Sequence, residues 1–143
     1  RRSPRETRRE GTQAMTIAIV KDVSLCVPSE PQYLRVIRQI AMVVGAKADL
    51  PLDCLDEGQL ASDEAANILM KFAEPNAVLY FDWGSQPGAL HLRARTRCLL
   101  SELPDLPKTL EYAWLIISAI TSHLDIFLAE DQVHIHLTVQ SDL

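Results

Sequence analysis

Two segments in the second half of the chain alternate between apolar and polar residues, and this pattern limits the possible folds most strongly. Their apolar members are Leu90, Leu92 and Ala94 in the first segment, and Val133, Ile135, Leu137 and Val139 in the second. Successive side chains of a strand point to opposite faces, so alternation predicts strands with one buried and one solvent-exposed face. The buried face of such a sheet has to be covered by a second layer.

Three stretches with helical spacing of apolar residues supply that layer. One helix opens at Pro31 and is expected to end at Gly45 as its cap, a second runs from residues 51–53 to 72–73, and a third spans residues 110–124. Further strands are expected at residues 16–27, 77–81 and 125–128, with residues 82–88 as a hairpin loop. The order predicts an α/β (α+β) two-layer sandwich, a mixed, mostly antiparallel sheet of about five strands covered by three helices on one face.

The composition fits one globular domain. The chain has 143 residues and a net charge of −5, and no apolar run approaches the roughly 20 residues of a membrane span. We therefore expect a cytoplasmic protein with no direct nucleic-acid or membrane partner. Residues 1–14 hold five arginines and no large apolar side chain. They are expected to be a disordered tail or a segment translated upstream of a start at Met15, with residues 15–143 as the domain.

The cysteines and histidines do not predict a metal centre. Cys26, Cys54 and Cys98 are widely spaced and form no CxxC pair, so reduced thiols are expected. His134 and His136 share one face of a strand, and with His91 they could in principle hold a metal. Two imidazoles without a third ligand at a defined spacing are, however, more typical of the wet face of a sheet.

The two tryptophans are expected to differ in their surroundings. Trp114 lies on the apolar stripe of the third helix and is expected in the core. Trp83 falls in the expected hairpin loop. There it either folds back onto the core or marks a contact surface.

Several motifs point to a known family. They are the order of elements, the opening Pro28-Ser29-x-Pro31, and Ala61-Ser62-Asp63-Glu64-Ala65 on the second helix. Over residues 16–140 the chain resembles the histidine-kinase-like ATPase (GHKL) domain, which has a Bergerat-type fold. Within that family it is similar to the small bacterial anti-sigma factors that double as serine kinases. The stretch from Asp63 to Leu79 and the residues Tyr112, Trp114, Ala119 and Phe127 resemble the stress and sporulation anti-sigma factors of actinobacteria.

The resemblance implies a function and a set of site residues. A homodimer of such a domain holds an alternative sigma factor away from RNA polymerase, and an anti-anti-sigma protein with a STAS domain competes for the same surface. In active members ATP lies between the helices and the sheet. A glutamate, matched here by Glu64, is the general base, and an asparagine four residues later holds Mg²⁺. Arg35 matches an arginine that contacts both protein partners, and Arg38 is a second candidate.

The sequence departs from the family in its nucleotide site. Ile68 stands four residues after Glu64, and Asn67 is one position early, which turns its side chain by about 100° around the helix. The first glycine box would fall at residues 95–99 and the second at residues 110–113, but no glycine occurs between Ala89 and Leu143. Phosphate loops need glycine because the backbone amides must approach the ligand closely. We therefore expect no nucleotide cofactor and regard Glu64 as a relic.

Three functions remain open from the sequence. The first is an anti-sigma factor released by partner exchange with a STAS protein, without nucleotide. The second is an active ATP-dependent serine kinase acting on a STAS protein, with Glu64 as base and Asn67 as a shifted Mg²⁺ ligand. The third is a pseudo-ATPase interaction domain unrelated to transcription, since a fold does not fix a function.

Overall fold

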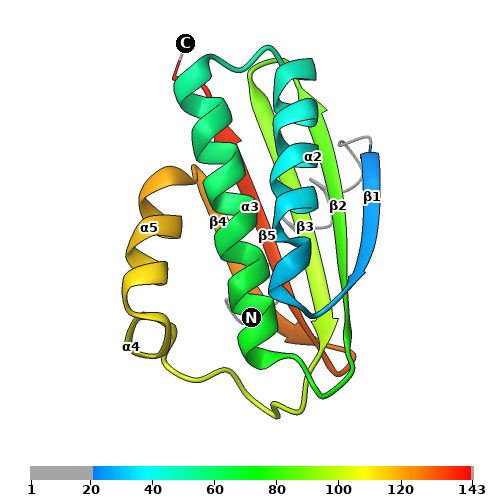
Figure 1. Ribbon diagram of the computed structural model, residues 1–143. Coiled ribbons are helices and arrows are strands. Elements are labelled where there is room, and N and C mark those ends of the chain that lie inside the picture. The colour runs from blue at the N-terminus through cyan, green and yellow to red at the C-terminus, as the bar shows by residue number, and fades with distance from the viewer. Residues whose placement is uncertain (1–20, 143) are drawn as a thin grey trace, which may run out of the picture.

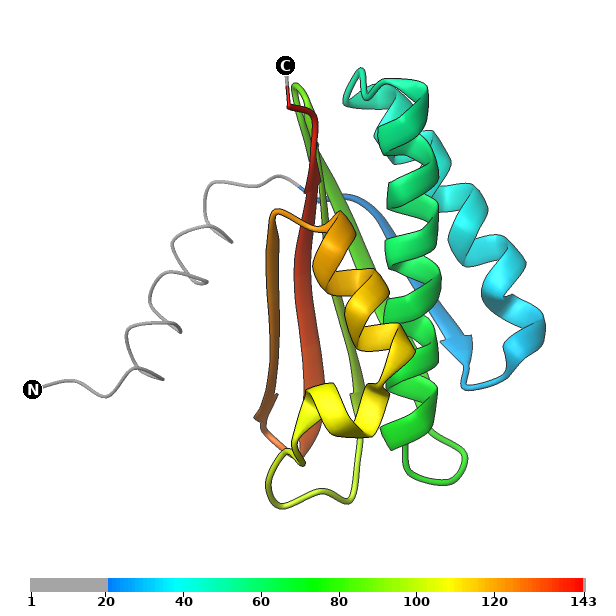
Figure 2. The same ribbon diagram turned by 90° about the vertical axis from the view of Figure 1, so that its left-hand side faces the viewer.

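A computed structural model describes residues 21–142 of the chain. The expected tail, the start at Met15 and the first residues of the expected strand 16–27 lie outside the described residues. Within them the chain forms two layers, a sheet and a set of helices on one of its faces (Figures 1 and 2). The predicted two-layer sandwich is confirmed.

The sheet has five strands in the order β1-β2-β3-β5-β4, and every neighbouring pair is antiparallel. The strands are β1 (Lys21–Pro28), β2 (Val78–Gln86), β3 (Ala89–Arg97), β4 (His123–Ala129) and β5 (Gln132–Gln140). The helices are the short 3-10 helix η1 (Pro31–Tyr33), α2 (Leu34–Lys47), α3 (Leu52–Phe72), α4 (Leu106–Leu110) and α5 (Tyr112–Ile120). Helix α3 lies between α2 and α5 in the helix layer (Figure 1).

The core lies between the sheet and α3, as the alternating segments require. The apolar residues of β3 and β5 are buried, while Arg93 and Arg95 between them lie on the outer face of the sheet and stay partly exposed. Helix α3 faces the sheet with small residues, so its backbone can approach closely. A Cβ on Gly58 would lie 2.9 Å from Leu90 Cδ2, which shows how tightly this contact is packed.

The end of α2 differs from the prediction. Gly45 is not the cap but a buried residue inside the helix, where a Cβ would lie 2.8 Å from Leu55 Cδ2. The residue with left-handed backbone is Asp49, with a φ of 58°. The amide of Leu50 donates to the carbonyl of Gly45, and that of Asp49 to the carbonyl of Ala46, which is the hydrogen-bond pattern of a Schellman cap. Aspartate fills this place because its short polar side chain tolerates the left-handed region.

The hairpin between β2 and β3 is also shorter than predicted. Residues 82–86 belong to β2, and the turn is only Pro87-Gly88, with a φ of 79° at Gly88. Proline followed by a glycine at positive φ is typical of a type II turn. Trp83 therefore lies in the strand and is fully buried, stacked on Phe81 at 5.4 Å between ring centroids. Of the two expectations for Trp83, the core position is confirmed.

The predicted third helix, residues 110–124, is shorter and corresponds to α5, and a separate short helix, α4, ends at Leu110 just before it. Glu111 separates α4 from α5 with a φ of 47° and a ψ of −111°. Helix α5 ends at Ile120, because Thr121 is extended and its hydroxyl donates to the Ile117 carbonyl at 2.7 Å. Leu124 belongs to β4, where the period of two continues through the strand. Trp114 is partly buried against the core rather than enclosed in it.

Candidate partner-binding site

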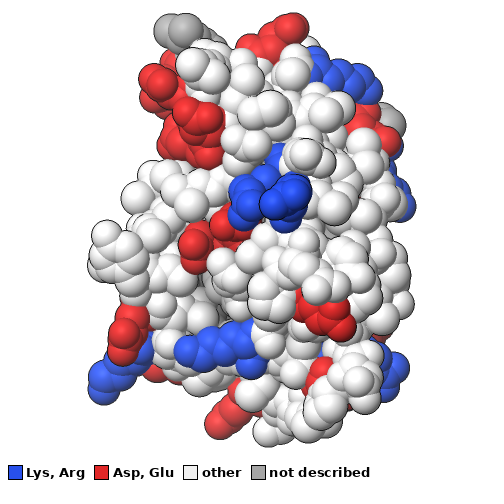
Figure 3. All heavy atoms as spheres, in the orientation of Figure 1, with Lys and Arg blue, Asp and Glu red and all other residues white. Residues whose placement is uncertain are grey.

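The outward side of α2 is an exposed, mainly apolar surface with one arginine at its edge. Helix α2 buries Ile37, Ala41, Val44 and Gly45 against α3 and the sheet, which turns the opposite side to solvent. That side forms the α2 surface, consisting of Arg35, Val36, Gln39, Met42 and Val43. Val36, Met42 and Val43 are 37%, 41% and 65% exposed. Figure 3 shows that much of the molecule's surface over α2 carries no charged group.

Arg35 and Arg38 are one helical turn apart, but they have different surroundings. Within residues 21–142, Arg35 is exposed and forms neither an ion pair nor a side-chain hydrogen bond. Arg38 donates from Nη1 to Asp63 Oδ1 of α3 at 3.0 Å, and its carbonyl accepts a bond from Gln59 Nε2 at 3.3 Å. Arg38 therefore joins α2 to α3, and Arg35 is the guanidinium that remains available for a partner.

The carboxylate pair of α3 is divided between two environments. Asp63 is the ion-pair partner of Arg38. Glu64 is half-buried, and burial, followed by the nearby charge of Asp63, raises the pKa of its carboxyl group. A raised pKa makes the carboxylate a stronger proton acceptor, and this is the one observation that favours a base at Glu64.

The metal side of the expected nucleotide site is incomplete. Ile68, four residues after Glu64, is 1% exposed and points into the core. Asn67 is exposed on the outer side of α3. In the described part of the chain, no group of three or more histidine, cysteine, aspartate or glutamate side chains could hold a metal ion. The buried Ile68 therefore leaves Asn67 as the only amide of α3 near Glu64 in the sequence.

Regular secondary structure occupies the places where the family has its glycine boxes. Arg95 and Arg97 are in the β3 ladder opposite Tyr80 and Gln132, and Cys98 is buried beside Ala73. Leu110 is buried at the end of α4. A phosphate-binding loop exposes several backbone amides to its ligand. In these segments the amide of Cys98 donates to the Asp131 carbonyl at 3.1 Å, and the amide of Glu111 donates to the Pro107 carbonyl at 3.1 Å.

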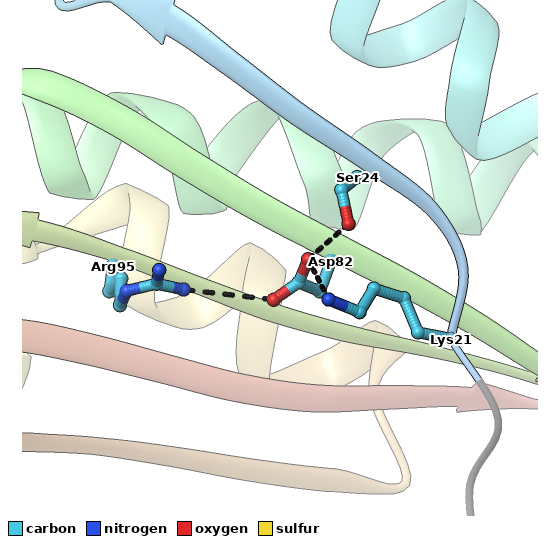
Figure 4. A network of polar contacts seen from close by, with 4 residues as sticks. All are labelled: Lys21, Ser24, Asp82 and Arg95. Carbon is cyan, nitrogen blue, oxygen red and sulfur yellow. Dashed lines mark hydrogen bonds and ion pairs between the residues drawn. The ribbon is translucent and has the colours of Figure 1, made fainter.

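The outer face of the sheet carries a group of polar side chains, and not all of them were expected in strands. Asp82, expected in a loop, lies in β2 and accepts a bond from Ser24 Oγ at 2.6 Å (Figure 4). Its carboxylate also forms ion pairs with Lys21 at 3.5 Å and with Arg95 at 3.6 Å. The guanidinium of Arg95 lies 4.7 Å from the Tyr80 ring centroid. Only the strand register, which the sequence does not specify, brings these residues together.

The histidines of this face make structural contacts. His91 is bonded to Thr138 Oγ1 at 2.9 Å and to Gln86 Oε1 at 3.1 Å. The ring of His134 stacks on Phe127, with 5.0 Å between centroids. Burial, followed by the charge of Arg93, lowers the pKa of His136 to about 4. His136 is therefore neutral at pH 7.

Comparison with known proteins places the chain in no family: no family model matches it, and no curated protein does. None of the helices within residues 21–142 has the length and apolar character needed to cross a membrane.

Proposed function

We propose that the chain is a cytoplasmic anti-sigma factor that sequesters an alternative sigma factor through the α2 surface. The observation that carries the proposal is the exposed α2 surface with Arg35 at its edge. Apolar groups beside an arginine are typical of the energetically important part of a protein interface. The sequence resemblance independently assigns partner contact to Arg35.

Release occurs by exchange with an anti-anti-sigma protein of the STAS type, without nucleotide. The support for this part is the condition of the nucleotide site. Most residues of both glycine-box segments belong to strand β3 or to helices α4 and α5, and Ile68 occupies the expected place of the Mg²⁺ ligand. A competitor that covers the same α2 surface is then sufficient to free the sigma factor.

The test uses capture of a sigma factor by the tagged full-length chain from a lysate of its host. We expect a sigma factor to be recovered in equal amounts with and without Mg-ATP. Arg35→Glu and Val43→Lys should each reduce recovery at least tenfold. The first reverses the charge of the arginine, and the second places an ammonium group where an apolar contact is expected. Arg93→Glu is the control, since Arg93 lies on the opposite, outer face of the sheet.

The outcomes separate the candidate functions. Recovery of a sigma factor that Arg35→Glu leaves unchanged would remove the α2 surface from the proposal. Recovery without any sigma factor would favour the pseudo-ATPase interaction domain. Displacement of the sigma factor by an added STAS protein that remains unphosphorylated would support partner exchange.

The raised pKa of Glu64 favours a second candidate, a serine kinase acting on a STAS protein. In that function Glu64 would accept the proton of the serine hydroxyl, and Asn67 would have to hold Mg²⁺ from its shifted position. Transfer of labelled phosphate from ATP to the STAS protein, abolished by Glu64→Gln, would establish the kinase and overturn release without nucleotide.

A further inference from the structure

The two edge strands of the sheet differ in their protection against pairing with another strand. Strand β1 begins with Lys21, ends with Pro28 and has an irregular register between Lys21 and Val23. A lysine, a proline and a bulge are the devices by which proteins prevent edge pairing. Strand β4 has none of them, and within residues 21–142 no strand pairs with its outer edge.

Apolar groups of the helix layer extend along the unprotected edge. Strand β4 and helix α5 form the side of the molecule that faces the viewer in Figure 2. The side chains of Leu124 and Leu128 point toward the helix layer and remain partly exposed. Helix α5 contains no charged residue, and its Tyr112 and Leu115 are 74% and 65% exposed. An apolar helix surface next to an open strand edge allows another molecule to contact both layers of the sandwich.

The sequence of β4 is complementary to itself in one register. Antiparallel pairing centred on Ile126 joins all seven residues of the strand to those of a second copy. Leu124 then lies opposite the second copy's Leu128 on the helix side, and Asp125 opposite the second copy's Phe127 on the outer side. Pairing centred on Asp125 would instead place two carboxylates directly opposite each other, which is unfavourable.

We propose that two copies of the chain form a homodimer by antiparallel β4–β4 pairing centred on Ile126, with their α5 helices packed against each other. The pairing creates one continuous sheet of ten strands and keeps the helices of both copies on the same face. This inference rests on the homodimer expected for the proposed function, and it adds the interface. It also leaves both α2 surfaces free, at the two far ends of the sheet from the contact.

Two pairs of matched lysine variants test the interface by light scattering of the full chain. The wild type is expected at twice the 16.0 kDa of one chain. Leu115→Lys should make the chain a monomer, whereas Val43→Lys, with the same 65% exposure on α2, should leave it a dimer. Leu124→Lys on β4 should likewise dissociate it, and Leu25→Lys, a partly buried helix-side residue of β1, should not.

The outcomes distinguish the interface from the function. A wild type that is monomeric at about 100 µM overturns the inference. A dimer that Val43→Lys or Leu25→Lys dissociates, while Leu115→Lys leaves it intact, overturns the β4 interface and keeps the homodimer. Capture of the sigma factor is measured on the same variants. The Leu115→Lys variant should be a monomer that still captures the sigma factor, and the Val43→Lys variant should be a dimer that does not. Because Leu115 is mostly exposed, loss of folding does not explain its effect.

Discussion

Glu111 holds an unfavourable backbone conformation for a residue with a Cβ. Its φ of 47° with a ψ of −111° lies outside the left-handed helical region that aspartate and asparagine tolerate. Such conformations persist only where the surrounding structure enforces them, at a cost of about 1–3 kcal/mol. Here Leu110 on one side and Ile117 on the other are both buried, and they fix the two helices relative to each other.

We therefore expect Glu111→Gly to stabilise the protein by about 1 kcal/mol, because glycine adopts this conformation without a Cβ clash. Urea denaturation measures the change as a higher midpoint. Glu111→Ala removes the same carboxylate but keeps the Cβ, so it should give no comparable gain. Equal stabilisation by both variants would mean that the side-chain charge, and not the backbone, is responsible.

His136 makes the stability of the protein depend on pH. The folded protein binds the imidazole proton more weakly than the unfolded chain, since the pKa of His136 falls from 6.5 to about 4. Stability is therefore complete above pH 6.5 and falls as the pH drops toward 4. The loss should be on the order of 2–3 kcal/mol. The pKa of His91 is lowered by burial and acts in the same direction, whereas the raised pKa of Glu64 acts in the opposite direction.

Urea denaturation at pH 7.5, 6.0 and 5.0 measures this dependence. His136→Gln should reduce the slope between pH 6.5 and 5, because the side chain no longer takes up a proton on unfolding. The groups around His136 include Arg93, His134 and His123, and each lowers its pKa to a smaller extent than burial does. An unchanged slope in the variant would assign the pH dependence to other groups.

At the scale of the elements, one buried hydrogen bond fixes helix α3 on the sheet. Trp83 Nε1 of β2 donates to Ser62 Oγ of α3 at 3.2 Å, and both residues are fully buried. We expect Trp83→Phe to cost about 2 kcal/mol, from the lost bond and the smaller ring. Ser62→Ala should cost about 1–2 kcal/mol, because it leaves the indole N–H without a partner.

The double variant separates the hydrogen bond from packing. If the bond is real, Trp83→Phe combined with Ser62→Ala costs less than the two single changes added together, by about 1 kcal/mol. Thermal or urea denaturation of the four proteins gives the coupling. Strict additivity would show that α3 is held by packing alone.

Elements with a long and regular spacing of apolar residues were the easiest to predict from the sequence. Strands β3 and β5 and helix α3 were predicted correctly, because each has a long and regular apolar pattern. The third helix was extended too far because Ile120 and Leu124 happen to stand four residues apart, although Leu124 begins the alternation of β4. The predicted hairpin loop began too early because glycine is common in turns, whereas Gly84 lies inside strand β2.

In the candidate site, the sequence predicted only those features that do not depend on how two elements pack. The exposure of Arg35 follows from its place on the side of α2 opposite the buried residues. The engagement of Arg38 by Asp63 depends on how α2 and α3 pack, and the sequence pattern contains no signal for that pairing. The ion pairs of Asp82 likewise depend on the register between three strands.

For the whole molecule, the packing of the two layers is the basis for expecting no bound nucleotide. Small residues allow α3 to pack directly on the sheet, and Trp83 fills the space between α3 and β2. Strand β3 covers most of the segment expected for the first glycine box, and the end of α4 and the start of α5 lie where the second is expected. Binding ATP between the layers would require separating buried contacts that now stabilise the fold.

Mg-ATP should accordingly give no saturable heat in calorimetry, and 5 mM Mg-ATP should leave the melting temperature unchanged. A ligand at about 1,000 times its dissociation constant adds roughly 4 kcal/mol of stability, so micromolar binding could not escape detection at that concentration. Glu64→Gln should behave in the same way as the wild type in both measurements, since the carboxylate is expected to contact no nucleotide. Micromolar affinity would show that the layers open to admit ATP, and release of the sigma factor would then have to be re-examined as a kinase reaction.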